Sequence, residues 1–370
     1  MAAVMILALA SAGDQLMRWF NPDTGLWDNY WWQGANMLSA VNDLSSLDEN
    51  VKNVYNSIWE NTYNNAPLNK PVSKRKRADG AYVEMSPEEV KNRKVRREDV
   101  GFISHYYDDE GWWALAWIGA LDNTGKREYL DEAIAIWYDM NAAWNKPACG
   151  GLPWNKDEGS GPLAIQNEIY IQVGAALANR VGDDQKNIYL DAAKEAWTWF
   201  QNIGLINSDN LINDGVDQDT CKNRGDPTFS YNQGVILGGL VELYEATGDE
   251  SYLDRASDIA NAVTIPGSSM LDDNGILVDE CDRTQSCSGD GIMFKGVFPR
   301  NLKKLQAVRP SEQWKSFLET NAQSIWSNDL SIEDGGCKNG VFWGGPYTEA
   351  DPAAQSSALD CLIAALAATS

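Results

Sequence analysis

The sequence contains almost no histidine, and several catalytic signatures are missing from it. His105 is its single histidine, and the chain has no CxxC pair, P-loop, dinucleotide-binding glycine motif or GxSxG nucleophile motif. These absences argue against a zinc site, thioredoxin-type redox chemistry, nucleotide binding and an α/β-hydrolase triad. We expect a structural role for His105, and neither a metal nor a cofactor.

Basic residues and long apolar runs are also scarce. The 370 residues include 30 Lys and Arg against 53 Asp and Glu, which gives a formal net charge of −23. Polyanions are bound largely through basic side chains, so nucleic acids and anionic membrane surfaces are excluded as expected partners. Because no run of 18 or more apolar residues occurs, no transmembrane span is predicted.

The sequence gives only weak indications for or against secretion. The run from Met1 to Ala12 resembles the tail of a signal peptide without its basic region, and it could equally begin the first helix. The carboxyl end shows no GPI-type signal. An Asn-x-Ser/Thr sequon is absent, which is mildly unfavourable to secretion.

Six cysteines are present, far apart along the chain: Cys149, Cys221, Cys281, Cys287, Cys337 and Cys361. An even number of separated cysteines favours disulfides formed in an oxidising compartment. Cys281 and Cys287 close a short loop and form the preferred pair, although the sequence cannot choose among all possible pairings. The alternative is a set of buried free thiols in a cytosolic protein.

An internal repeat of about 60 residues is the most informative pattern present. The motif Tyr-Leu-Asp begins at Tyr129, Tyr189 and Tyr252, at spacings of 60 and 63 residues, and a degenerate copy begins at Trp314. Each copy opens a helix with apolar residues along one face. We predict that these amphipathic helices lie on the outside of the fold.

A second set of predicted helices is apolar on all sides and rich in glycine and alanine. These helices span 31–44, 107–121, 165–179, 230–245, 293–307 and 355–367. A helix that is apolar all round must be buried all round, which places this set in an inner ring. The sequence therefore predicts one all-α domain over residues 1–370, an (α/α)6 toroid whose inner helices begin at one end. An open superhelix of the TPR type has a shorter repeat, of about 34 residues.

One basic segment interrupts the repeat. Ten Lys and Arg stand against four Asp and Glu between Lys70 and Arg97, including the run from Lys74 to Arg77. A nuclear signal or a dibasic processing site could have this composition. We predict an inserted surface loop at about 64–100.

Asp108 and Asp109 begin the second inner helix. Acids in this position also cap a helix and suit its dipole, so the pattern has an ordinary structural explanation. Because the inner helices begin at one end of the ring, however, both carboxylates are expected to face one central cavity. Two carboxylates are the minimum equipment for glycosidic bond cleavage, and their close approach favours retention of configuration.

Ten further side chains are expected at the mouth of the same cavity, because they lie at or near the starts of inner helices. Amides, charged groups and indoles together suit a neutral sugar, which needs hydrogen bonds for its hydroxyls and flat apolar faces for its ring. With 16 tryptophans in the chain, we expect about a quarter of them in a ligand groove. The predicted substrate-binding residues are Trp31, Trp32, Asn36, Trp112, Asn167, Tyr231, Gln233, Lys295, Arg300 and Gln355.

Four motifs resemble glycoside hydrolase family 76. They are YDDEGWWALAW at 107–117, CGGLPW at 149–154, YNQG at 231–234 and FKGVFPR at 294–300. The resemblance implies an (α/α)6 fold and a retaining endo-α-1,6-mannanase, in which Asp108 is the nucleophile and Asp109 the acid/base. It also implies a relation to fungal proteins thought to transfer mannose-bearing GPI glycans onto wall glucan.

The expected function is therefore hydrolysis of α-1,6-linked mannan by a secreted or cell-wall enzyme that acts as a monomer on mannan or mannose oligosaccharides. Two alternatives stay open. One is a cell-wall transglycosidase acting on mannose-containing GPI glycans, and the other is a non-catalytic mannan-binding protein. The aspartate-rich loops at 214–217 and 272–275 lack the complete EF-hand spacing, so we expect turns there and no calcium site.

Overall fold

The computed structural model describes residues 2–28, 30–47, 49–70, 74–76, 82–84, 101–333 and 336–369. Long helices dominate these residues, and short two-residue or three-residue strands form small hairpins between them. The predicted all-α class is confirmed.

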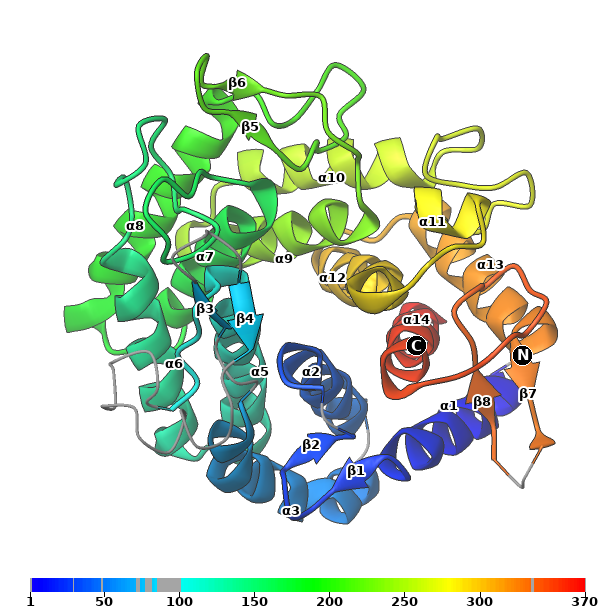
Figure 1. Cartoon of the computed structure of the whole chain (residues 1–370). Helices are drawn as coiled ribbons and strands as arrows, with labels where there is room; N and C mark the ends of the chain where they lie inside the picture. The colour runs from blue at the N-terminus through cyan, green and yellow to red at the C-terminus, as the bar shows by residue number, and fades with distance from the viewer. Residues whose placement is uncertain are drawn as a thin grey trace.

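Six helices form an inner ring in the described part of the chain. They are α2 (Trp32–Leu47), α5 (Tyr107–Thr124), α7 (Ala164–Ala178), α9 (Ser230–Thr247), α12 (Phe294–Val308) and α14 (Pro352–Thr369). Each inner helix packs on the next, and α14 packs back on α2, which closes the ring (Figure 1). The six observed ranges match the six predicted ones to within a few residues.

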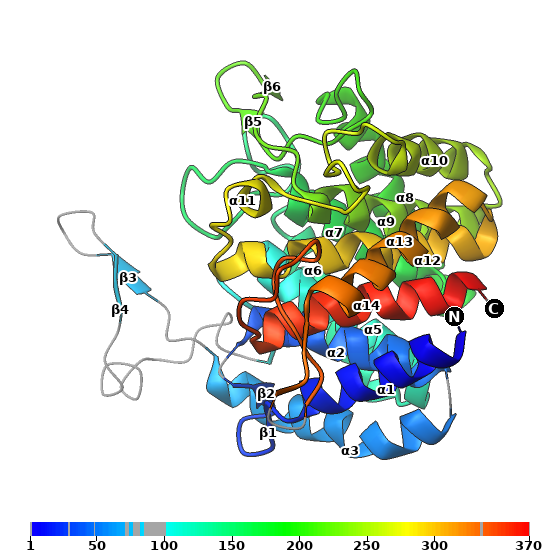
Figure 2. The same cartoon turned by 90° about the vertical axis from the view of Figure 1, so that its right-hand side faces the viewer.

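Six outer helices cover this ring. They are α1 (Ala2–Met17), α3 (Glu49–Asn65), α6 (Arg127–Asn141), α8 (Asp183–Asn202), α10 (Ser251–Thr264) and α13 (Glu312–Asn328). In Figure 1 they surround the inner helices, and in Figure 2 the two sets lie roughly alongside one another. The toroid inferred from the repeat is the observed fold.

Burial explains why the two sets differ in composition. Every residue of α7 is buried, whereas α8 buries one stripe: Tyr189, Leu190, Ala193, Ala196, Trp197 and Phe200. A stripe at this spacing is one face of a helix. Where inner helices cross closely, glycine is required: a Cβ on Gly234 would lie 2.6 Å from the Cα of Phe298.

The segment at the amino end, which could be read as a signal-peptide tail or as the first helix, forms the outer helix α1. Leu9, Ala12 and Leu16 of α1 are buried, and α1 packs against α14. Figure 1 shows the two chain ends on the same side of the molecule. Among the described residues, none of the helices has the length and apolar character needed to cross a membrane.

Only part of the predicted insertion is described. Helix α3 continues to Asn65 and is followed by the 3-10 helix η1 (Ala66–Asn69). Strands β3 (Lys74–Lys76) and β4 (Tyr82–Glu84) form an antiparallel hairpin that stands away from the ring in Figure 2. The remaining residues of the insertion lie outside the described ones, so the predicted surface loop stays a prediction.

Three more antiparallel hairpins and two short helices lie in the described loops. The strand pairs are β1 (Phe20–Asn21) with β2 (Leu26–Trp27), β5 (Val216–Asp217) with β6 (Lys222–Asn223), and β7 (Leu330–Ser331) with β8 (Lys338–Asn339). The short helices are α11 (Glu280–Arg283) and the 3-10 helix η3 (Gly289–Ile292). Both short helices lie in the loop that leads to α12, so this loop reaches the start of an inner helix.

Two disulfides lie in loops on the side where the inner helices begin. Cys281 pairs with Cys287, as predicted from their short spacing, and Cys149 pairs with Cys221 across 72 residues. Cys337 and Cys361 are free thiols. The pairing of Cys149 with Cys221 depends on the meeting of two loops, which no sequence spacing reveals.

Candidate active site

A cavity of about 420 Å³ opens where the inner helices begin. The first turns of α2, α5, α7, α9 and α12 each contribute side chains to its wall, and loops that precede inner helices supply the rest. The predicted convergence of helix starts on one cavity is therefore observed. Its size is within the range of small-molecule sites, about 300–1,000 Å³.

Asp108 and Asp109 both line this cavity. The indole N–H of Trp154 donates to Oδ2 of Asp108 at 3.1 Å, and the backbone N–H of Asp109 donates to Oδ1 at 3.1 Å. Asp109 accepts a long hydrogen bond from the Ser104 hydroxyl at 3.4 Å. Each carboxylate of the pair is thus held by neutral donors, and no ion pair of the described residues involves either one.

The surroundings raise the pKa of both carboxyls. Burial raises the pKa of Asp108 to about 6, against the lowering effect of the Trp154 hydrogen bond. Burial, followed by the charge of Asp108 and then that of Asp290, raises the pKa of Asp109 well above its usual range. The pKa of Asp109 is thus raised further than that of Asp108, so Asp108 ionises more readily and Asp109 keeps its proton to higher pH, a division that suits acid-assisted substitution.

The third acid of the Asp-Asp-Glu run points away from the cavity. Glu110 is fully buried, and its Oε2 accepts the Ser104 N–H at 2.8 Å and Lys156 Nζ at 3.1 Å. Lys156 also pairs with Asp139 at 2.6 Å. Burial raises the pKa of Glu110 to about 8. This cluster anchors Ser104, in the loop before α5, to the first turn of that helix, which carries Asp109.

Two further carboxylates in the cavity wall were missed by the sequence analysis. Asp290 lies in η3 and accepts from the Trp32 indole at 3.2 Å. Asp214 accepts from Tyr231 Oη at 3.3 Å and from Asn232 at 2.9 Å. Burial raises the pKa of both carboxyls. Both residues come from loops, where no periodic pattern indicates which way a side chain faces.

Three pairs of aromatic rings form another part of the cavity wall, which also contains the aliphatic side chains of Leu163, Ile165, Met293 and Val297. The Trp32 and Trp112 rings are stacked with centroids 6.5 Å apart, and the rings of Tyr231 and Phe294 are stacked at 4.0 Å. Tyr106 packs on Trp154 at 4.9 Å. Three of the 16 tryptophans therefore line the cavity. Flat faces beside carboxylates can stack on sugar rings while the acids bind hydroxyls.

Comparison with known proteins agrees with this architecture. The sequence model described as Glycosyl hydrolase family 76 matches residues 10–370. The chain belongs to glycosyl hydrolase family 76. The resemblance drawn from the four motifs is thereby confirmed, and so is the prediction of a glycoside hydrolase.

Relatives of this family 76 chain include a mannan endo-1,6-alpha-mannosidase from Candida albicans, which is 25% identical over 367 residues, or 91% of this chain and 72% of that protein. A second mannan endo-1,6-alpha-mannosidase from the same organism is 25% identical over 220 residues, covering 56% of this chain and 48% of its own length.

Among solved structures, an inactive variant of an α-1,6-mannanase from Salegentibacter sp. has two aspartates replaced and is in complex with α-1,6-mannotetrose. It matches with a TM-score of 0.74 at 22% identity, covering 97% of this chain and 98% of that chain. At this identity the likeness establishes the toroid fold.

Three of the ten predicted substrate-binding residues line the cavity of the family 76 chain: Trp32, Trp112 and Tyr231. Three predicted amides instead hold loops: Asn167, Gln233 and Gln355. The Leu152 N–H donates to Asn167 Oδ1 at 2.7 Å, and Asn167 Nδ2 donates back to the Leu152 carbonyl at 3.1 Å. The other two amides accept the backbone N–H groups of Ile212 and Asn339 at 2.8 Å. These amides satisfy buried loop backbone.

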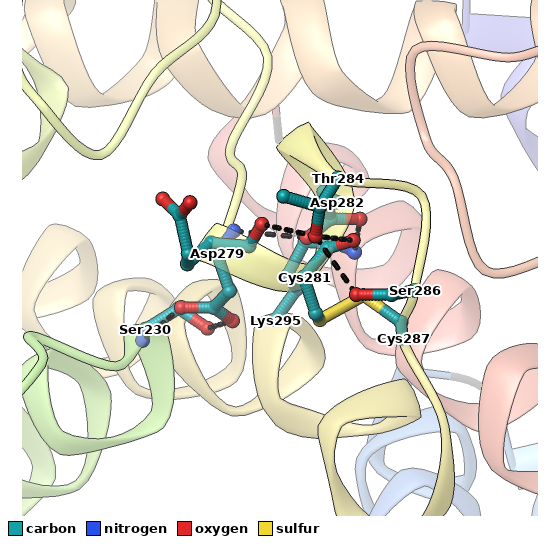
Figure 3. Close-up of a disulfide and its surroundings, with 9 residues drawn as sticks. Ser230, Asp279, Cys281, Asp282, Thr284, Ser286, Cys287 and Lys295 are labelled. Atoms are coloured by element: carbon teal, nitrogen blue, oxygen red, sulfur yellow. Dashed lines mark hydrogen bonds and ion pairs between the residues drawn. A yellow bond between two sulfur atoms is a disulfide. The ribbon is translucent and has the colours of Figure 1, made fainter.

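The remaining four predicted residues are buried between helices and loops: Trp31, Asn36, Lys295 and Arg300. Arg300 pairs with Asp360 and donates to Asn36 Oδ1 at 2.7 Å. Lys295 pairs with Asp282 beside the Cys281–Cys287 disulfide (Figure 3), and Trp31 Nε1 donates to the Ala66 carbonyl at 3.1 Å. A helix start presents side chains in all directions, and these face neighbouring elements instead of the cavity.

Of the two loops considered for calcium, 272–275 forms the predicted turn, whereas 214–217 contains the bridge residue Gly215 and strand β5, so the prediction of a turn there was wrong. Oδ1 of Asp272 accepts the backbone N–H groups of Asn274 at 2.8 Å and Ile276 at 2.9 Å, as in an Asx-turn. In the described residues, one group of three potential metal ligands is compact enough to hold an ion, namely Cys281, Asp282 and Cys287. Its two sulfurs are bonded to each other, which leaves a single carboxylate. His105 lies 3.5 Å from Asp157, outside the cavity wall.

Proposed function

We propose that the protein is a retaining endo-α-1,6-mannanase that hydrolyses α-1,6-linked mannan by double displacement. The observation that carries the proposal is the pair of adjacent carboxylates in an aromatic-walled cavity, of which Asp108 ionises more readily than Asp109. The curated relatives carry the name mannan endo-1,6-alpha-mannosidase, and an inactive mannanase variant of the same fold, with two aspartates replaced, is in complex with α-1,6-mannotetrose. Both support mannan as the substrate.

In the first step of the proposed reaction, ionised Asp108 attacks the anomeric carbon of a bound mannose unit. Protonated Asp109 donates its proton to the glycosidic oxygen as the bond to the leaving sugar breaks. The Trp154 N–H, which donates to Oδ2 of Asp108, holds this carboxylate in place. The products of this step are a mannosyl-enzyme ester and a shortened mannan chain.

In the second step, Asp109 is ionised and takes a proton from a water molecule. The resulting hydroxide attacks the anomeric carbon, the ester bond to Asp108 breaks, and the configuration of the original linkage is restored. Asp214 and Asp290 lie in the same cavity. As hydrogen-bond acceptors they orient sugar hydroxyls against the aromatic walls.

For its setting, we propose a secreted or cell-wall monomer whose partner is mannan or a mannose oligosaccharide. Two disulfides support an oxidising compartment. The proposal is checked by the molar mass of the purified protein in solution and by its recovery from culture medium or wall extracts of its own source.

The proposed function is tested by incubating purified protein with linear α-1,6-mannan and following the products and their anomeric configuration by NMR. Early release of α-configured oligosaccharides of mixed length supports a retaining endo-hydrolase. Release of β-configured products refutes the double displacement. Release of mannose alone refutes endo action.

Two other outcomes correspond to the other functions considered. Elongated products with a labelled sugar acceptor, in place of hydrolysis, identify a transglycosidase. Tight oligosaccharide binding without any cleavage identifies a non-catalytic mannan-binding protein.

A further inference from the structure

Lys156 is a largely buried cation that follows the cavity residue Trp154 by two positions. Its side chain is 15% exposed, and its ammonium group pairs with Glu110 at 3.1 Å and with Asp139 at 2.6 Å. The same group lies 5.1 Å from the centre of the Tyr107 ring. One buried cation therefore links three segments of the chain, namely the start of α5, the outer helix α6 and the loop that follows Trp154.

Backbone hydrogen bonds pair the segment around Lys156 with the segment that leads into α5. The Tyr107 N–H donates to the Trp154 carbonyl at 3.1 Å, and the Lys156 N–H donates to the His105 carbonyl at 3.1 Å. The residues between these two pairs form an antiparallel bridge. Side chains two positions apart on an extended segment point to the same side. Lys156 thus fixes the segment whose Trp154 indole donates to Asp108.

A second connection leads from Lys156 to Asp109. Oε2 of Glu110 accepts Lys156 Nζ at 3.1 Å and the backbone N–H of Ser104 at 2.8 Å. The Ser104 hydroxyl in turn donates to Asp109 at 3.4 Å. This bond is already long, so a small displacement of Ser104 breaks it. The position of the Asp109 carboxyl therefore depends on the Glu110 oxygen that Lys156 holds.

The cluster around Lys156 has an energetic cost. Glu110 is fully buried, and burial raises its pKa to about 8 against the lowering effect of Lys156. A buried ion pair is weak evidence for a gain in stability, because desolvation opposes the attraction between the charges. What such a pair does supply is fixed geometry, since moving either partner away leaves a buried charge unpaired.

We propose that Lys156 is a positioning residue for the glycosidase reaction, which holds the two segments in the register that lets Trp154 and Ser104 bind the cavity acids. This inference rests on the proposed mannanase function. Lys156 acts through other side chains and does not touch the substrate. Its removal should therefore slow the chemical step without weakening substrate binding, because every residue that lines the cavity is retained.

The test is Lys156→Met, which keeps an apolar stem and removes the cation. We expect kcat on α-1,6-mannan to fall by about 30-fold to 100-fold, as for a misplacement of reacting groups by about 1 Å. KM should change by less than about twofold. Lys156→Arg keeps the charge and can pair with both acids, so it should restore kcat to within about fivefold of the parent value.

The matched control is Lys303→Met. The Lys303 side chain is 16% exposed and pairs with Asp43 at 2.7 Å, between the middle turns of α12 and α2. This variant should lose thermal stability, as Lys156→Met does, and keep the parent kcat and KM. If Lys156→Met also loses only stability and keeps the parent kcat, its role is structural and the proposal is wrong.

A second variant covers the case in which Lys156→Met does not fold. Lys156→Met/Asp139→Leu removes one acid together with the cation, and the remaining Glu110 can stay protonated, so no charge is left unpaired. The proposal requires the same fall in kcat here, because Glu110 has still lost the group that holds it. A folded double variant with the parent kcat overturns the proposal.

A parent enzyme that cleaves no α-1,6-mannan contradicts the proposed function, and the positioning role is then decided by crystal structures of the parent and of Lys156→Met/Asp139→Leu. Loss of either the Trp154–Asp108 or the Ser104–Asp109 hydrogen bond in the double variant supports the positioning role. Both bonds unchanged overturn it.

Discussion

The candidate active-site cavity and the interior of the ring both enclose carboxylates, but the residues around these carboxylates differ. In the interior, Asp360 is buried with Arg300, whose Nε lies 3.0 Å from Oδ1. In the cavity, the described hydrogen-bond donors to Asp108 and Asp109 are neutral, and the described charges that act on Asp109 are those of other acids. A paired carboxylate holds two helices together, whereas an unpaired one is left to bind and release a proton.

The largest expected effect comes from removing the two cavity acids. We expect Asp108→Ala and Asp109→Ala each to lower kcat on α-1,6-mannan by at least about 10³-fold, because each removes a group that acts in the transition state. Thermal unfolding should show both variants folded. Asp290→Asn, which removes another cavity charge, should lose far less activity. Near-parent turnover in either alanine variant would disprove the assigned roles.

The interior pair is tested by Arg300→Met. This change leaves Asp360 buried without its cation, and we expect the free energy of unfolding to fall by about 3–5 kcal/mol. Denaturant unfolding monitored by tryptophan fluorescence measures the loss. The double variant Arg300→Met/Asp360→Leu should recover much of it, since no charge is then left unpaired. A single variant as stable as the parent would show that the pair contributes little.

Glu168, next to the cavity, is another buried acid, and it has no cationic partner among the described residues. Both of its oxygens lack hydrogen-bond partners, and burial raises its pKa well above the usual range. Below about pH 4 this carboxyl is neutral in both folded and unfolded chains. Above that, this carboxyl ionises first in the unfolded chain, so its contribution to the free energy of unfolding falls by up to about 1.4 kcal/mol per pH unit until the folded pKa is reached.

Glu168→Gln should abolish this pH-dependent loss in the free energy of unfolding. Unfolding free energies at pH 4, 5, 6 and 7 should diverge from those of the parent as pH rises, with the variant gaining relative stability. Glu312→Gln, at the exposed start of α13, serves as the control and should run parallel to the parent. A parallel line for the Glu168 variant would place its pKa in the ordinary range.

The smallest expected effect concerns the hydroxyl beside Asp109. Ser104 stabilises the ionised form of Asp109, while burial and the charges of Asp108, Asp290 and Glu110 favour the protonated form. Ser104→Ala should raise the Asp109 pKa further and move the alkaline limb of the kcat/KM profile to higher pH, by less than about one unit. Ser46→Ala, on the exposed end of α2, should leave the profile unchanged. A shift to lower pH would contradict this role for Ser104.

The helices and the ring could be predicted because their signals are local. The stripe that begins at Tyr189 and the apolar run around Gly234 follow from helical periodicity alone. The same periodicity, with the common direction of the inner helices, was enough to place Asp108 and Asp109 at a cavity. The two disulfides divide similarly: the short Cys281–Cys287 loop was predictable, and the distant Cys149–Cys221 pair was not.

The tertiary structure determined which other residues line the cavity. Asp214, Asp290 and Trp154 reach the cavity from loops whose paths depend on the closing of the ring, and loop conformation leaves no periodic trace in a sequence. Lys295 and Gln233 show the converse. Their positions at helix starts suggested substrate contact, but rotation about the helix axis directs one toward Asp282 and the other toward loop backbone. Which direction a helix start faces is set by how six hairpins pack together, and only the assembled ring contains that information.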